Sequence, residues 1–173
     1  MQEAEVCLRI AMYFIKQGIT EEDVQVSLDG AHIKTKNQIH FDIWDFMKRE
    51  NIIKVAGDKE SWRGEYRITG YAPRIVIVSK SGEGDVRINL QNGKICFVEC
   101  KKDRVNSMHA LMREAIGQLM TSPEFTDKIV PVVGVPYTEQ TYMLASKWSK
   151  YPQIKNVGIQ FMLVHESGEL TII

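Results

Sequence analysis

Residues 84–102 read GDVRINLQNGKICFVECKK, and this stretch decides how the chain is expected to fold. Apolar and polar residues alternate on both sides of Asn92-Gly93, as in two half-buried strands joined by a tight turn. A two-residue turn would place Val86 opposite a charged residue, whereas a three-residue loop with a left-handed Gly93 pairs it with Val98. Because a one-residue slip moves every side chain to the wrong face, the sequence predicts the three-residue loop.

This register gathers charged side chains on one face of the hairpin. Asp85 is expected opposite Glu99, with their Cβ atoms about 5 Å apart, and Lys101 one step further along that face. Carboxylates this close repel each other unless a cation lies between them, and Mg²⁺ takes carboxylate oxygens as ligands. Such a metal activates water, while a lysine orients that water or stabilises charge on a phosphate. The alternative is a surface hairpin on which Lys101 balances two acids.

The two arms of the hairpin carry a known motif. Gly84-Asp85 followed by Glu99-Cys100-Lys101 resembles the PD-(D/E)XK motif of the restriction-endonuclease-like nucleases, with Gly-Asp in place of Pro-Asp. The resemblance implies that Asp85 and Glu99 bind Mg²⁺ or Mn²⁺, assisted by the main-chain carbonyl of Cys100, and that Lys101 is catalytic. It also implies that the substrate is DNA and that the chain acts as a homodimer.

The resemblance covers roughly residues 74–136 and points to a glutamine outside the hairpin. In this superfamily the helix after the Glu-x-Lys strand often supplies a Gln near the catalytic lysine, which makes Gln118 a catalytic candidate. Several branches have Gln-x-x-x-Tyr, and this chain has Ser122 where the Tyr would stand. The alternative for Gln118 is a polar residue at the edge of a helix.

Basic and acidic residues elsewhere are further candidates. Lys102, Arg104 and Arg87 could hold the phosphates that flank a scissile bond, or could form a solvated charge cluster. Members of the resembled superfamily often add an acid from a helix to the metal site. Three acids compete for that role here, with the alternative that each is a plain surface charge: Glu3, Asp42 and Glu50.

Composition sets limits on the class of protein. The chain has 173 residues, of which 44% are hydrophobic and 25% charged, and a formal net charge of zero. It therefore lacks a global basic field, which leaves a local basic groove or an additional protein partner to bring it to DNA. No apolar run has membrane length. Three cysteines without a C-x-x-C indicate reduced thiols in a cytoplasm, and four scattered histidines form no zinc signature.

The first 70 residues predict a separate helix–hairpin–helix region. An amphipathic stripe with a C-terminal Gly18 predicts a helix over 3–17. Alternation broken at Asp29-Gly30 predicts a hairpin over 24–36, followed by a helix over 38–50 with Ile39 turned inward. IIKVA and EYRIT then read as two strands around a polar turn. We expect residues 1–70 to pack on the core as a recognition or dimerisation element.

Residues 71–173 predict an α/β core. The expected elements are strands over 74–79, 128–136, 157–164 and 169–173, and helices over 107–120 and 138–150. Two strand–helix–strand units imply parallel connections, and the hairpin adds antiparallel strands. The sequence therefore predicts a mixed central β-sheet flanked by helices, an architecture that is also that of the restriction-endonuclease-like core.

These observations predict a metal-dependent endonuclease that hydrolyses phosphodiester bonds in DNA through its Asp/Glu-x-Lys site. One alternative is a catalytically silent nucleic-acid-binding or assembly module of the same fold. Another is a small-molecule-binding α/β domain in which the motif is coincidental. An intact Asp/Glu/Lys set argues against a purely structural role, since two adjacent carboxylates add nothing to it.

Overall fold

The structure is a computed structural model that describes residues 1–36, 38–79, 84–104, 106–122 and 125–173. Its helices are α1 (Glu3–Lys16), α2 (Gly30–Ile33), α3 (Ile43–Arg49), α4 (Met108–Thr121), α5 (Glu139–Trp148) and α6 (Pro152–Val157). Its strands are β1 (Val24–Ser27), β2 (Lys34–Thr35), β3 (Gln38–Ile39), β4 (Ile52–Ala56), β5 (Gly64–Ile68), β6 (Arg74–Val78), β7 (Val86–Asn89), β8 (Ile95–Cys100), β9 (Ile129–Pro136), β10 (Gln160–Val164) and β11 (Leu170–Ile172).

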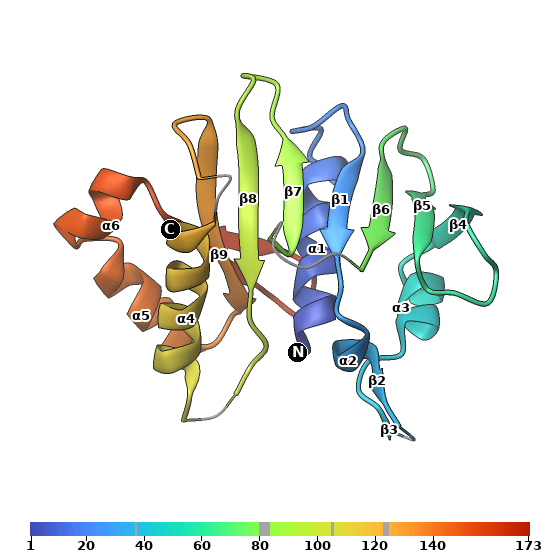
Figure 1. Cartoon of the computed structure of the whole chain (residues 1–173), viewed down its shortest axis with the longest axis horizontal. Coiled ribbons are helices and arrows are strands. Elements are labelled where there is room, and N and C mark those ends of the chain that lie inside the picture. The colour runs from blue at the N-terminus through green and yellow to red at the C-terminus, as the bar shows by residue number, and fades with distance from the viewer. Residues whose placement is uncertain (37, 80–83, 105, 123–124) are drawn as a thin grey trace.

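Nine strands form one mixed sheet in the order β11-β10-β9-β8-β7-β1-β6-β5-β4 (Figure 1). β8, β9 and β10 are parallel and are connected through helices, as the two strand–helix–strand units predict. β7 runs antiparallel to β8, and β11 forms an antiparallel edge. The predicted α/β class with a mixed central sheet flanked by helices is therefore confirmed.

Helices cover both faces of the sheet. α1 lies behind the sheet in Figure 1 and α4 lies in front of it. On the α1 side the buried stripe of that helix packs against apolar residues of β1, β6, β7 and β8. On the other side α4 and α5 bury apolar residues against β9 and β10. Each fully buried Leu, Ile or Phe stabilises the fold by about 1.5–3 kcal/mol, so the two layers hold the sheet from both sides.

Close approach of α1 to the sheet depends on Gly134 in β9. A Cβ at this position would lie 2.6 Å from Cδ1 of Ile10 and 3.2 Å from Sγ of Cys100. The missing side chain therefore leaves room for Ile10, which is completely buried. α1 ends at Lys16, one residue before the predicted end, and Gly18 stops it with a left-handed φ of 64°.

The hairpin predicted over residues 24–36 is wrong. β1 instead lies in the middle of the sheet, parallel to β6 and antiparallel to β7. Asp29 does not begin a turn between strands, since its side chain accepts the N–H of Ala31 at 2.9 Å and caps α2. Asx residues favour turns and helix N-caps alike, so the local sequence did not separate the two outcomes.

The second predicted helix begins later than expected. Gln38 and Ile39 form the short strand β3 against β2, and the side chain of Ile39 is 61% exposed rather than inward. α3 begins at Ile43, where Asp42 caps it by accepting the N–H of Asp45 at 2.9 Å. Downstream, the strand predicted from residue 157 begins at Gln160, because Pro152 starts the short helix α6.

Residues 1–70 and 71–173 share one sheet and the hydrophobic core on the α1 side of that sheet. β1 lies inside the nine-stranded sheet, between β7 and β6. β5 and β4 lie at one edge, where the two predicted strands around a polar turn are found. Arg74 ties the two parts together, since its guanidinium binds Asp23 at 2.6 and 3.0 Å and Glu65 at 2.5 Å. The hydrogen bond from Arg74 lowers the pKa of Asp23. In the described part of the chain, no helix has the length and apolar character needed to cross a membrane.

Candidate metal centre

The β7–β8 hairpin has the predicted register. Val86 pairs with Val98, and the chain reverses through a loop over 91–93 in which Gly93 has a φ of 78°. The Leu90 N–H donates to the Lys94 carbonyl at 2.8 Å and closes this loop. The apolar row of each arm faces α1, so the alternation of the sequence correctly chose the three-residue loop.

The ladder ends one pair before Asp85 and Glu99. Asp85 directs its backbone N–H to the Val98 carbonyl at 2.9 Å, while its carboxylate accepts the N–H of Cys100 at 2.7 Å. The side chain thus takes a hydrogen bond at the point where the ladder stops. This arrangement fixes the carboxylate beside Cys100, the residue that separates Glu99 from Lys101.

Gly84 explains why this chain has Gly-Asp in place of Pro-Asp. Its φ is 69°, which the ring of proline cannot adopt. A Cβ at residue 84 would also lie 2.7 Å from the Phe97 ring. Both constraints require glycine, so the residue before Asp85 is set by backbone geometry and by the packing of Phe97.

Replacing Gly84 with alanine should therefore destabilise the protein by ~1–3 kcal/mol, from the left-handed backbone and the clash with Phe97. Gly117 on α4 is the matched control, because a Cβ added there would have no described atom within 4 Å outside its own helix turn. Gly117→Ala should stabilise by ~0.5–1 kcal/mol through helix propensity. Chemical denaturation of both variants tests this, and equal stabilities would contradict it.

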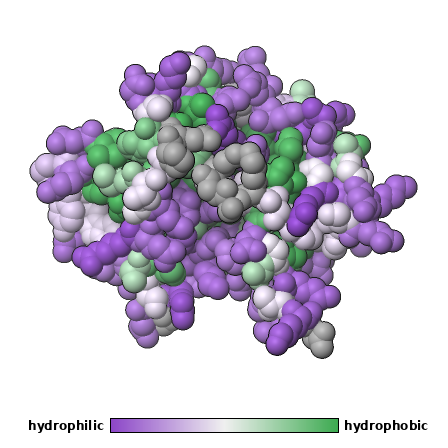
Figure 2. Space-filling model, viewed as in Figure 1, coloured by the Kyte–Doolittle hydropathy of each residue, from purple (hydrophilic) through white to green (hydrophobic). Residues whose placement is uncertain are grey.

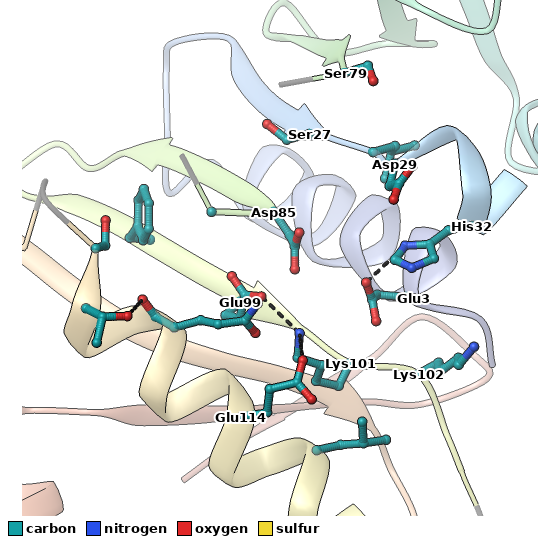
Figure 3. A pocket seen from close by; sticks show the side chains of 17 residues that line it. Glu3, Ser27, Asp29, His32, Ser79, Asp85, Glu99, Lys101, Lys102 and Glu114 are labelled. Carbon is teal, nitrogen blue, oxygen red and sulfur yellow. Dashed lines mark hydrogen bonds and ion pairs between the residues drawn. The ribbon is translucent and has the colours of Figure 1, made fainter. Parts of the chain in front are cut away.

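A pocket of about 760 Å³ is lined by Asp85, Glu99 and Lys101 (Figure 3). Its walls come from α1, the end of β1 with the following α2, the β7–β8 hairpin and α4. Hydrophilic residues cover the middle and lower part of this face of the molecule (Figure 2). The described lining residues include five carboxylates, two lysines and one histidine: Glu3, Asp29, Asp85, Glu99, Glu114, Lys101, Lys102 and His32.

Glu99 and Lys101 form a buried ion pair on β8. Their Oε1 and Nζ atoms are 3.0 Å apart, and the two residues are 8% and 6% exposed. Lys101 also approaches Glu114 of α4 at 3.4 Å. Burial lowers the pKa of Lys101, but the charge of Glu99 and its hydrogen bond outweigh that effect, so the pKa is raised. Lys101 is therefore held as a cation.

The two carboxylates of the motif are both destabilised as anions. Burial, and then the charge of Glu99, raise the pKa of Asp85 to about 8. Burial also raises the pKa of Glu99, although Lys101 partly offsets that rise. Without a metal, one lysine at this position does not neutralise all the acids around it. This donor set of carboxylate oxygens with raised pKa values fits a hard divalent cation.

Among the three helical acids considered from sequence, Glu3 is the one that lines the pocket. Its Oε1 lies 3.0 Å from Nδ1 of His32, and its side chain is 13% exposed, so it is neither frayed nor free in solvent. Asp42 instead caps α3, and Glu50 lies 3.5 Å from Arg9. The hydrogen bond to Glu3 raises the pKa of His32.

The structure separates the other predicted residues into two groups. Lys102 and Gln118 line the pocket, as does Ser122, which stands where the resembled motif would have a tyrosine. Arg87 and Arg104 are not among the described residues of the pocket wall: Arg87 lies within β7 opposite Phe97, and Arg104 is exposed before α4. Their proposed contact with nucleic acid would have to lie outside the pocket.

Sequence reasoning missed His32 and Glu114 as members of the site. His32 lies in the segment predicted to be a hairpin, which hid its position beside α1. Glu114 had a usable signal, since it precedes Gln118 by one helical turn and so lies on the same side of α4. Neither residue could be placed against its partner without knowing how the helices pack.

Comparisons of the chain with protein-family profiles, with curated proteins and with solved structures found no match. What the site can do is therefore inferred from its own residues. Carboxylates of α1, β8 and the entry to β7 converge around one buried lysine. Such a site can hold a divalent cation and can present an ammonium group to an anionic substrate.

Proposed function

We propose that the protein is a metal-dependent endonuclease that hydrolyses phosphodiester bonds in DNA. The observation that carries this proposal is the convergence of Glu3, Asp85 and Glu99 with Lys101 in one pocket. These residues come from three separate elements, and two of them form a buried ion pair. Buried charges are costly, so a structural role alone gives little reason to place them together.

Asp85 and Glu99 would hold Mg²⁺ or Mn²⁺, with the Cys100 carbonyl as a further ligand and Glu3 on the opposite wall. The bound cation lowers the pKa of a coordinated water and neutralises charge on a phosphate. The excess of carboxylates in the pocket repels a polyanion, so the binding of DNA here depends on that neutralisation. The metal requirement follows from the charge of the residues themselves.

Lys101 would act as a positioned hydrogen-bond donor. Its raised pKa keeps it charged, which suits it to orient the attacking water and to stabilise negative charge on the phosphate. Glu114 offers a second acceptor at 3.4 Å and keeps the ammonium group near β8 when Glu99 turns to the metal. Glu114 is thus a positioning residue that acts through Lys101.

Lys102 and Gln118, both on the pocket wall, would hold the scissile strand near the site. We further propose that the fold is of the restriction-endonuclease-like kind and that the chain acts as a homodimer, with Arg87 and Arg104 contacting DNA beyond the pocket. A neutral net charge leaves room for an additional protein partner. Three free, buried cysteines are the basis for proposing a cytoplasmic location.

The test is cleavage of labelled linear, nicked, single-stranded and four-way-junction DNA in Mg²⁺, Mn²⁺ or EDTA. We expect cleavage that requires the metal, and thermal stabilisation by Mg²⁺ that Glu99→Gln removes. Glu139→Gln, on the exposed first turn of α5, is the control and should leave both readouts unchanged. Binding of DNA without cleavage under every condition would favour the catalytically silent module. If Mg²⁺ gives no thermal stabilisation and the protein does not bind DNA, the motif is coincidental.

A further inference from the structure

Asp85 also borders two thiols on the side away from the pocket. Cys7 of α1 and Cys100 of β8 each place a sulfur near its carboxylate, and the three ligand atoms all lie within 4.8 Å of one another. Both cysteines are free, and they are only 1% and 0% exposed. A helix, a strand end and the entry to β7 thus bring two sulfurs and one carboxylate oxygen to one point.

The two cysteines lie in the apolar layer between α1 and the sheet. Burial raises the pKa of Cys7 to about 11, although a hydrogen bond from Cys100 partly offsets the rise. Burial also raises the pKa of Cys100, and the nearby Asp85 carboxylate adds to the effect. A soft cation would convert this unfavourable grouping into a set of ligands.

We propose that Cys7, Cys100 and Asp85 form a second metal site, specific for thiophilic divalent cations such as Zn²⁺ and Cd²⁺. Thiolates select these ions, whereas Mg²⁺ and Mn²⁺ prefer oxygen. Each thiol releases its proton to solvent as its sulfur takes up the ion. The ion enters past Asp85, which borders both the pocket and the thiols.

The spacing of the ligand atoms suits such an ion after a small contraction. Zinc binds thiolate sulfur at about 2.3 Å and carboxylate oxygen at about 2.1 Å, so tetrahedral ligand atoms lie about 3.5–3.8 Å apart. The present limit of 4.8 Å requires closure by at most about 1.3 Å, which rotation of a cysteine side chain can supply. Three protein ligands leave the fourth position for water from the pocket.

Sharing of Asp85 couples the two sites. When the Asp85 carboxylate binds an ion at Cys7 and Cys100, it can no longer bind Mg²⁺ beside Glu99. Zn²⁺ or Cd²⁺ should therefore oppose Mg²⁺-dependent cleavage, a consequence that rests on the proposed function. Binding of the thiophilic ion does not rest on it, because the two cysteines have no part in cleavage through their sulfurs.

The experiment is a titration of the reduced, metal-stripped full chain with Cd²⁺, without Mg²⁺ and without DNA. We expect a sulfur-to-cadmium charge-transfer absorbance that saturates at a single ion per chain. Cys7→Ala and Cys100→Ala should each remove it. Cys96→Ala is the matched control, since Cys96 is a third free thiol, on the same strand and face as Cys100 and only 2% exposed. That variant should retain the full absorbance.

Asp85→Asn provides a second test that keeps both thiols and accepts the same hydrogen bond from Cys100. It should weaken Cd²⁺ binding by at least ~10-fold. Absorbance that is absent from the wild type, that survives loss of Cys7 or Cys100, or that disappears with Cys96 would overturn the proposal. Because the readout needs no substrate, failure of this site and failure of the nuclease proposal are separate results.

Discussion

Lys101→Met should reduce metal-dependent cleavage by about 10²- to 10⁴-fold, the range typical of a lost positioned acid–base or hydrogen-bonding group. Methionine keeps much of the length and volume of the lysine stem but removes the ammonium group that lies 3.0 Å from Glu99. The measurement is single-turnover cleavage in Mg²⁺ of the DNA form that the wild type cuts best. An unchanged rate would contradict the assigned role of Lys101.

Two variants control this measurement. Lys94→Met changes an exposed lysine at the opposite end of β8 and should leave the rate unchanged. Lys101→Arg preserves the charge but replaces a compact ammonium group with a planar fork, so it should keep the fold stable while restoring little of the rate. Circular dichroism of each variant separates loss of chemistry from loss of structure. A full rate in Lys101→Arg would mean that charge alone is sufficient.

Asp85→Asn should stabilise the metal-free protein while removing its response to Mg²⁺. The pKa of Asp85 is raised from 3.8 to about 8, chiefly by burial and then by Glu99, so the folded state binds a proton more tightly than the unfolded state does. The contribution of this group to stability is complete below about pH 4 and is lost as the pH rises towards 8. At pH 8 in EDTA the neutral amide should gain on the order of a few kcal/mol.

Denaturation at pH 5 and pH 8 in EDTA tests this sign. The wild type should lose stability between the two values, whereas Asp85→Asn should lose less, so the advantage of the variant grows with pH. Adding Mg²⁺ at pH 8 should stabilise the wild type but not Asp85→Asn. Asp103→Asn, an exposed acid near the same end of β8, is the control and should behave as the wild type does. An Asp85→Asn variant less stable than the wild type at pH 8 would refute this account of the site.

The sequence contained enough information for the hairpin and for the parallel half of the sheet. In β7 and β8 the alternation of apolar and polar residues fits a single pairing register, because a shift by one residue would bury charged side chains. The apolar run that becomes β9 indicates a strand covered on both faces, and its neighbours follow from the handedness of crossovers. The charged core of the site, Asp85, Glu99 and Lys101, was predictable because a single hairpin carries all three.

Long-range pairings could not be predicted from local patterns. β1 is a short strand whose partners lie far along the chain, so nothing beside it in the sequence indicates them. The same is true of Glu3 and His32, which meet only because α2, after β1, lies beside the first turn of α1. Asp29-Gly30 favoured a turn and a helix cap about equally, and tertiary packing decided between them.

The position of β1 has a consequence for how the chain folds as it is made. Val24 pairs with Ile75 of β6, and Val26 pairs with Val86 of β7. The two neighbours of β1 therefore cannot pair with it until about half of the chain has left the ribosome. Proteins are synthesised at about 5–20 residues per second, so this delay lasts several seconds. During that time β1 and the apolar face of α1 lack their final partners. The last strand added on that side, β7, brings Asp85 with it. The pairing of β1 is therefore completed by the segment that carries Asp85, and Glu99 and Lys101 of the candidate metal centre follow with β8.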